Sequence, residues 1–71
     1  MERHIQLDWD AIVKEAIKRR KELHYSQAKM AILAGVSKPT LIRFEQGERT
    51  ITLNSAFAIL SLLGLLEQVA S

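Results

Sequence analysis

The 71-residue sequence predicts a compact all-α domain of four to five helices. Apolar residues recur at helical spacing, start and stop signals separate the helical segments, and no β-hairpin signal interrupts them. A chain of this length buries only about 60% of its unfolded surface, so modest stability is expected. With 48% apolar residues and no Cys, the core must come from packing rather than from disulfides or thiolate-bound zinc.

The first helix is expected to begin near Asp8 or Asp10, because either carboxylate can cap it, and to run to about Leu23. Residues 1–7 before it are expected to form a flexible arm. One stripe at helical spacing contains Ile12, Ala16, Arg20 and Leu23, with Trp9, Val13 and Ile17 beside it. Most of the remaining cations of this helix are expected on a solvated face, and Arg19 is nearest the expected DNA side; these cations are Lys14, Lys18, Arg19 and Lys21.

Arg20 departs from the apolar stripe on which it lies. A cation on an inward face needs a partner, because burying it alone would cost several kcal/mol. Glu45 is the candidate, and the alternative is that Arg20 extends to solvent. A pair between the two would fix the first helix against the third.

Capping residues divide the middle of the chain into two short helices. Ser26 is expected to open the second helix, and Ser37 or Lys38 the third. Gly35 falls where the second helix must reverse, a position that favours a positive φ. Gly47 provides the matching stop for the third helix.

A tight turn joins these two helices into one unit over residues 26–46. Ala31 lies where the helices approach closely, and a longer side chain there would push them apart. Such a pair exists mainly to place its second helix, here 37–46, in the major groove of DNA. Five apolar residues tie the unit together: Met30, Ala34, Val36, Leu41 and Phe44.

A polar loop at 48–51 leads to a fourth helix with Thr52 as its N-cap and Gly64 as its stop. Residues 65–69 form either a fifth short helix or a terminal strand. The whole chain, 1–71, is expected to be a single domain. The fourth helix is expected to point five residues inward: Leu53, Ala56, Phe57, Leu60 and Leu63.

Over roughly residues 9–65 the chain resembles the phage-repressor type of helix-turn-helix domain, the XRE family of bacterial and phage transcription factors. The resemblance implies five helices, an Arg20–Glu45 ion pair, and dimers that bind double-stranded DNA at inverted-repeat operators and repress transcription. It is carried by Ser26-Gln27, Met30-Ala31, Ala34-Gly35-Val36-Ser37, Thr40-Leu41, Phe44-Glu45-Gln46-Gly47, and Leu53 through Leu63-Gly64-Leu65.

A weaker similarity relates the chain to antitoxins of the HipB type, which bind a toxin protein and also repress their own operon. Ile32 and Leu33 support this alternative, because the family often keeps that face of the second helix polar. The similarity rests on the stretch from Phe44 through Thr52, Leu53, Phe57, Ile59, Leu60 and Leu63.

Five residues are expected to meet the DNA backbone. Gln27 opens the second helix, and in the family the glutamine at this position grips the sugar-phosphate chain. Ser37 and Thr40 are expected beside phosphates, although Ser37 has the alternative of acting only as a cap. Arg49 and Thr50 lie in the loop that the family lays against the backbone. For each charged or polar residue the alternative is ordinary solvation.

Base reading is expected from the outward face of the third helix. Arg43 is the best candidate, because its planar fork matches the O6 and N7 acceptors of guanine. Lys38 can contact a guanine or a phosphate. With Leu41 and Phe44 facing inward, the outward residues are Lys38, Pro39, Ile42, Arg43 and Gln46.

Pro39 and Ile42 depart from the polar reading face of the family. Proline is tolerated in a first helical turn but biases Lys38 away from helical angles, so the helix is expected to begin one residue late. Both residues offer only apolar contacts, such as to a thymine methyl group. Fewer hydrogen bonds to bases are therefore expected than in a polar-faced member.

A single unit of this kind reads only a few base pairs, and two-fold dimers engage half-sites about 34 Å apart. The chain end is more apolar than a small monomer needs, which favours a homodimer patch there. The alternative is that this end closes the domain's own core. The patch would contain Leu62, Leu65, Leu66 and Val69.

Other function classes find little support. His4 and His24 are the only histidines, without metal-ligand spacing, and so few residues leave little room for a catalytic pocket. We therefore expect no enzyme activity, metal or cofactor. The formal net charge of +2 does not by itself indicate nucleic-acid binding. The charged first residues are no signal peptide, and the apolar run 62–66 is too short to span a membrane. The expected location is the cytoplasm, in association with the nucleoid, for a chain of bacterial or phage origin.

Overall fold

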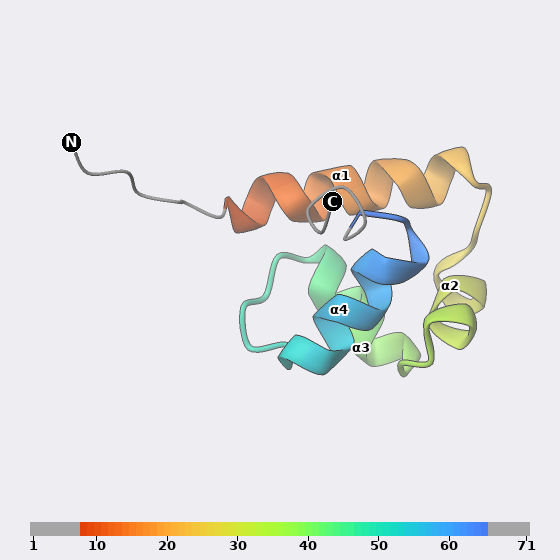
Figure 1. Cartoon of the computed structure of the whole chain (residues 1–71). Coiled ribbons are helices and arrows are strands. Elements are labelled where there is room, and N and C mark those ends of the chain that lie inside the picture. Colours follow the sequence, from red (N-terminus) through yellow and green to blue (C-terminus); the bar gives the residue numbers. More distant parts are fainter. Residues whose placement is uncertain (1–7, 66–71) are drawn as a thin grey trace.

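The computed structural model describes residues 8–65, which form four helices and no strand: α1 (Trp9–Glu22), α2 (Gln27–Ala34), α3 (Lys38–Glu45) and α4 (Leu53–Leu62). Helix α1 lies along one side of the domain and the three shorter helices gather on the other (Figure 1). The all-α class is therefore confirmed. The predicted arm at 1–7 and residues 66–69 of the predicted last element lie outside the described residues.

Each of these four helices starts at a side-chain cap. The side-chain oxygens of Asp8, Ser26, Ser37 and Thr52 each accept the backbone N–H three residues further on, at 3.0–3.2 Å. The first cap is thus Asp8 rather than Asp10. Helix α3 begins directly after Ser37, so the late start predicted from Pro39 was wrong; a proline in the first turn removes no helical hydrogen bond.

Each helix also ends in the same reversal. One residue with positive φ donates its N–H to the carbonyl three residues back, and the next residue donates to the carbonyl five residues back, which is the Schellman pattern. At the ends of α2, α3 and α4 this residue is a glycine, as predicted: Gly35, Gly47 and Gly64, with φ of 75°, 85° and 75°. At the end of α1 it is His24, with φ of 61°, which the sequence did not predict.

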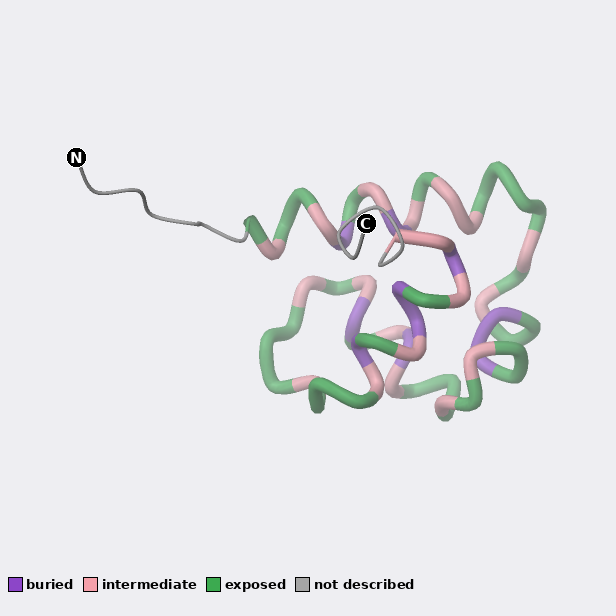
Figure 2. The backbone as a smooth tube through the Cα atoms, in the orientation of Figure 1, coloured by how far each residue is buried: buried purple, intermediate pink, exposed green. Residues whose placement is uncertain are grey.

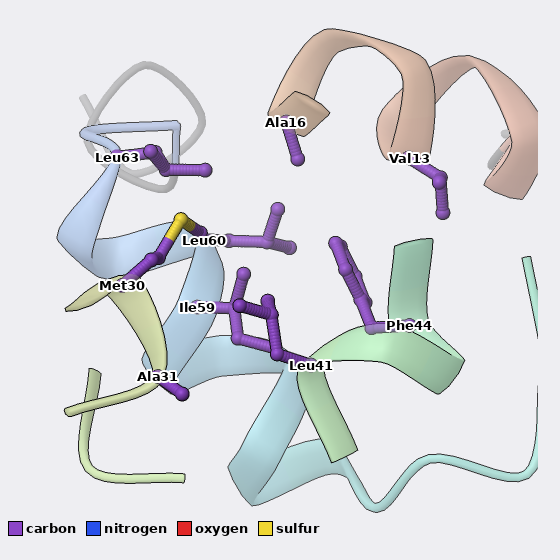
Figure 3. Packing of buried hydrophobic residues seen from close by; sticks show 9 residues of the cluster. All are labelled: Val13, Ala16, Met30, Ala31, Leu41, Phe44, Ile59, Leu60 and Leu63. Carbon is purple, nitrogen blue, oxygen red and sulfur yellow. The ribbon is translucent and has the colours of Figure 1, made fainter. Parts of the chain in front are cut away.

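The core lies where the inner sides of all four helices meet (Figure 2). Phe44 and Leu41 of α3 are fully buried and pack with Met30 and Ile59 from the neighbouring helices (Figure 3). Trp9 packs against this core from the start of α1, where its ring meets the Phe44 ring edge-on, with centroids 5.5 Å apart. Full burial of each such side chain contributes about 1.5–3 kcal/mol. The core therefore centres on α3 and fixes how its opposite face is presented.

Two predicted inward residues of α4 point outward. Leu53 is 71% exposed and Phe57 48% exposed, whereas Ile59, which the predicted stripe omitted, is fully buried. Ala56 and Leu60 are buried as predicted. Because α4 is apolar on nearly all sides, its sequence does not reveal which stripe faces the core.

The inward stripe of α1 is shorter than predicted. Val13 and Ala16 are buried, but Leu23 is 47% exposed because it lies past the last helical residue and caps the helix instead. No described helix has the length and apolar character needed to cross a bilayer.

Arg19, which was expected nearest the DNA side, is half-buried and hydrogen-bonded within the domain. Its Nη1 donates to the carbonyl oxygen of Leu63 at 3.2 Å, and its Nε donates to Glu15 at 3.1 Å. The carbonyls at the end of a helix lack helical partners and carry the negative end of the helix dipole. Arg19 therefore caps the end of α4 and ties that helix to α1.

Candidate nucleic-acid interface

Helices α2 and α3 form the predicted unit of two helices and a tight turn. Gly35 makes the reversal, and the Val36 N–H bonds back to the Ala31 carbonyl at 3.0 Å. Ala31 is buried where α2 meets the rest of the core, so its small side chain allows close packing. The turn therefore holds α3 in one orientation relative to α2.

The face of α3 opposite the core is presented to solvent. Leu41 and Phe44 are fully buried on the inner side, and Glu45 is held within the domain by Arg20 and Gln27. Ile42 is half-buried, so it offers less surface to the outside than predicted. The exposed residues along this helix and its C-cap are Lys38, Pro39, Arg43 and Gln46.

The guanidinium of Arg43 is already engaged by two side chains of the loop after α3. Its Nε donates to the Glu48 carboxylate at 2.6 Å, and its Nη2 donates to the Thr50 hydroxyl at 3.1 Å. Glu48 was not among the predicted site residues. Gly47 could have revealed it, because a glycine reversal places the next residue beside the one five positions earlier.

The side chain of Gln27, at the start of α2, is oriented by a hydrogen bond to Glu45 of α3. Its Nε2 donates to Oε1 of Glu45 at 2.9 Å. The same carboxylate accepts Nε and Nη2 of Arg20, at 2.7 and 3.1 Å, so the ion pair expected between them is present. One carboxylate thus holds the start of α2 and the end of α1 in a fixed relation to α3.

The other residues expected beside the DNA backbone divide into two groups. The Ser37 hydroxyl caps α3 and donates to the Thr40 hydroxyl at 2.8 Å, so the two side chains form a local pair at the start of α3. Arg49 and Thr50 are exposed in the loop between α3 and α4. Arg49 there lies beside an open apolar hollow lined also by Trp9 and Leu53.

The surface that results is polar and mostly cationic. Lys38, Arg43 and Arg49 are all exposed on α3 or the loop after it, and Glu48 is the one carboxylate within that loop. Guanidinium and ammonium groups at such a surface suit an anionic partner with acceptor groups, such as nucleic acid.

Comparison with known proteins agrees with this geometry. A helix-turn-helix family model matches residues 17–67, which include α2, α3 and α4 and the turn between the first two. The chain belongs to the XRE-type helix-turn-helix family. This helix-turn-helix chain is also 35% identical over 54 residues to a protein of Haemophilus influenzae named as an uncharacterized HTH-type transcriptional regulator. The match covers 76% of the chain and 55% of that relative, so the chain spans about half the relative's length.

The helix-turn-helix chain also exposes apolar side chains on α2 and α4, outside the proposed reading face of α3. On α2 these are Ile32, which is 78% exposed, and Leu33; on α4 they are Leu53 and Phe57. Of the predicted homodimer patch, Leu62 and Leu65 are half-buried and pack against the core. Leu66 and Val69 of that patch lie outside the described residues.

Proposed function

We propose that the chain is a sequence-specific, double-stranded DNA-binding transcriptional regulator that places α3 in the major groove. The supporting observation is the presentation of α3. Buried Leu41 and Phe44 hold one side of it against the core, while Lys38, Arg43 and Gln46 face outward beside the loop that carries Arg49. A recognition helix needs this combination of a rigid support and a polar outer face.

In this proposal α3 reads bases with four residues. Arg43 reads a guanine through its O6 and N7 acceptors, and Lys38 contacts a guanine or a phosphate. Pro39 and the exposed part of Ile42 meet thymine methyl groups. With few polar side chains on this face, the chain relies more on DNA shape and A·T content than a polar-faced reader does.

Backbone contacts position α3 in the groove. Gln27, already oriented by Glu45, meets a phosphate at the start of α2, where free N–H groups and the helix dipole favour an anion. Arg49 binds phosphate from the loop. Ser37, Thr40 and Thr50 add hydroxyl contacts to the DNA backbone, and all three side chains already take part in local hydrogen bonds.

The regulator acts as a homodimer on an inverted repeat and represses transcription. One recognition helix reads only a few base pairs, and a dimer gains affinity by engaging two half-sites about 34 Å apart. Leu65 belongs to the predicted dimer patch, whereas Phe57 on α4 offers more exposed apolar surface. Sedimentation of Leu65→Ser and Phe57→Ser separates the two: the variant that becomes monomeric identifies the surface.

Selection of bound duplexes from a random pool tests DNA recognition. The wild type is expected to enrich one motif with inverted symmetry. On that motif Arg43→Ala should lose about 1–3 kcal/mol and relax discrimination at one base pair, while binding to random DNA falls less. Equal losses of Arg43→Ala on the motif and on random DNA would contradict base reading, and a pool without enrichment would contradict sequence-specific binding.

A second candidate function is that of an antitoxin that binds a toxin protein and autoregulates its operon. The observation that favours it is that Ile32 and Leu33 on α2 are exposed, on a face that the resemblance leads one to expect polar. A neighbouring toxin gene would supply the partner to test. Binding that Ile32→Ser abolishes and Arg43→Ala leaves intact would support this function; a chain that binds no neighbour-encoded protein would not.

A further inference from the structure

Glu48 stands beside Arg43 because of how α3 ends. Gly47, with φ of 85°, reverses the chain, and the Glu48 N–H bonds back to the Arg43 carbonyl at 3.1 Å. That backbone bond places the two side chains next to each other, and their salt bridge measures 2.6 Å. The helix stop thus brings Glu48 next to Arg43, and Thr50 further along the loop binds the same guanidinium.

The two loop contacts occupy one particular edge of the guanidinium. Nε and Nη2 form the side edge, and these are the nitrogens that donate to Glu48 and Thr50. Arg20 uses the same edge for Glu45, but it also donates from Nη1 to the Tyr25 carbonyl, so its end is occupied as well. Among the described residues, the hydrogen bonds of Arg43 use Nε and Nη2 on the side edge, and none uses Nη1 at the end edge.

We infer that Glu48 is a specificity-determining residue that positions Arg43 for bidentate reading of guanine through this end edge. The inference rests on the proposed function. Two parallel N–H groups at the end of the guanidinium match O6 and N7 of guanine. An arginine held in place before binding also loses less side-chain freedom when it docks, so orientation by Glu48 favours the correct base.

The charge of Glu48 works in the same direction. A carboxylate close to the DNA surface repels phosphates and neutralises the attraction of Arg43 for any phosphate backbone. Both side chains are nearly half exposed, so the pair adds little to folding stability. Glu48 therefore lowers affinity for all sequences while favouring the cognate base, which is how a specificity element differs from an affinity element.

Nuclear magnetic resonance of the DNA-free protein tests the positioning step alone. The Arg43 Nε–H signal is expected to be shifted and protected from solvent exchange in the wild type and in Glu48→Gln, which keeps an acceptor oxygen of the same reach. Glu48→Met, which keeps the length but has no oxygen acceptor, should lose both features. An Arg43 signal that Glu48→Met leaves unchanged overturns the positioning of Arg43 by Glu48.

Discrimination against a mismatched duplex tests the reading step. Two duplexes are compared: the selected motif, and the same motif with a substitution at the guanine where Arg43→Ala relaxes discrimination. The measured quantity is the ratio of the affinity for the first duplex to the affinity for the second. Glu48→Met should lower this ratio about tenfold, within the range expected for a bidentate base contact, and should bind random DNA more tightly. Glu48→Gln should keep most of the ratio. Glu22→Met, which removes a carboxylate at the end of α1, is the matched control and should change neither quantity.

Two failures are distinguishable in this experiment. A wild type that enriches no motif overturns the proposed function, and this inference with it. A wild type that enriches a motif, with Glu48→Met raising affinity for motif and mismatch equally, overturns the inference alone, because Glu48 then only repels phosphate.

Discussion

Arg20 in α1 and Glu45 in α3 form a two-bond ion pair across 25 positions of sequence, with side chains only 13% and 8% exposed. Glu45 also accepts the Gln27 amide, and Arg20 also donates to the Tyr25 carbonyl. All three guanidinium nitrogens of Arg20 and both carboxylate oxygens of Glu45 thus have hydrogen-bond partners. The pair joins the scaffold helix to the proposed recognition helix and orients the first residue of α2.

Removing one member of this pair should destabilise the fold strongly. Arg20→Met leaves the Glu45 carboxylate nearly buried with Gln27 as its remaining side-chain partner, and is expected to cost about 3 kcal/mol in the free energy of unfolding. The double variant Arg20→Met/Glu45→Met should recover part of that loss, since it leaves no buried charge unpaired. Urea titrations measure both; a double variant that loses the full sum of two single losses would speak against coupling.

Arg19 should contribute to stability through the end of α4. Arg19→Met removes the hydrogen bond to the Leu63 carbonyl and is expected to cost about 1 kcal/mol. Lys18→Met is the matched control, because Lys18 is the exposed cation next in the chain and its loss should be close to neutral. Thermal unfolding of the two variants provides the comparison, and equal melting temperatures would contradict the capping role.

His24 should be a position where the protein can be stabilised. A residue with a Cβ is strained at φ of 61°, whereas glycine is not, so His24→Gly is expected to gain about 0.5–1 kcal/mol. His24→Ala keeps the strain and is the control. A His24→Gly variant that unfolds no later in urea than His24→Ala would show that the backbone conformation there carries no cost.

The orientation of α4 predicts unequal effects of trimming its apolar residues. Ile59→Ala should cost about 2–5 kcal/mol, because it opens a cavity in the centre of the core. Leu53→Ala, on the mostly exposed side, should stay within about 0.5 kcal/mol. The free energy of unfolding of each variant tests this orientation of α4. Similar losses of stability in the two variants would mean that α4 packs with a different face.

Arg49 should act on all DNA sequences alike. Arg49→Ala is expected to weaken the selected motif and random DNA by similar factors and to reduce the salt dependence of binding by about one unit. Lys14→Ala, an exposed cation of α1, is the control and should leave the slope unchanged. A loss confined to the selected motif would make Arg49 a base-reading residue instead.

The helix limits could be predicted because their causes are local. Caps such as Ser26 and Thr52 and stops such as Gly35 and Gly47 act through backbone groups a few residues away, so the sequence alone reveals them. The Arg20–Glu45 pair could be anticipated as well, since a cation within an apolar stripe needs a partner. The missed stop at His24 has the same geometry, but only the fold imposes left-handed backbone on a residue that is not glycine.

The sequence by itself determined the all-α class, the starts and most stops of four helices, and which face of α3 is buried, because capping and helical periodicity act within a single segment. Only the tertiary structure decided that α4 packs through Ile59 rather than Phe57, and that Arg19 caps a helix 44 positions away. The same holds for Glu48 and Thr50 sharing the Arg43 guanidinium. These contacts depend on how separate helices and loops pack together. The local sequence around an apolar or charged residue does not reveal which distant residue it will contact.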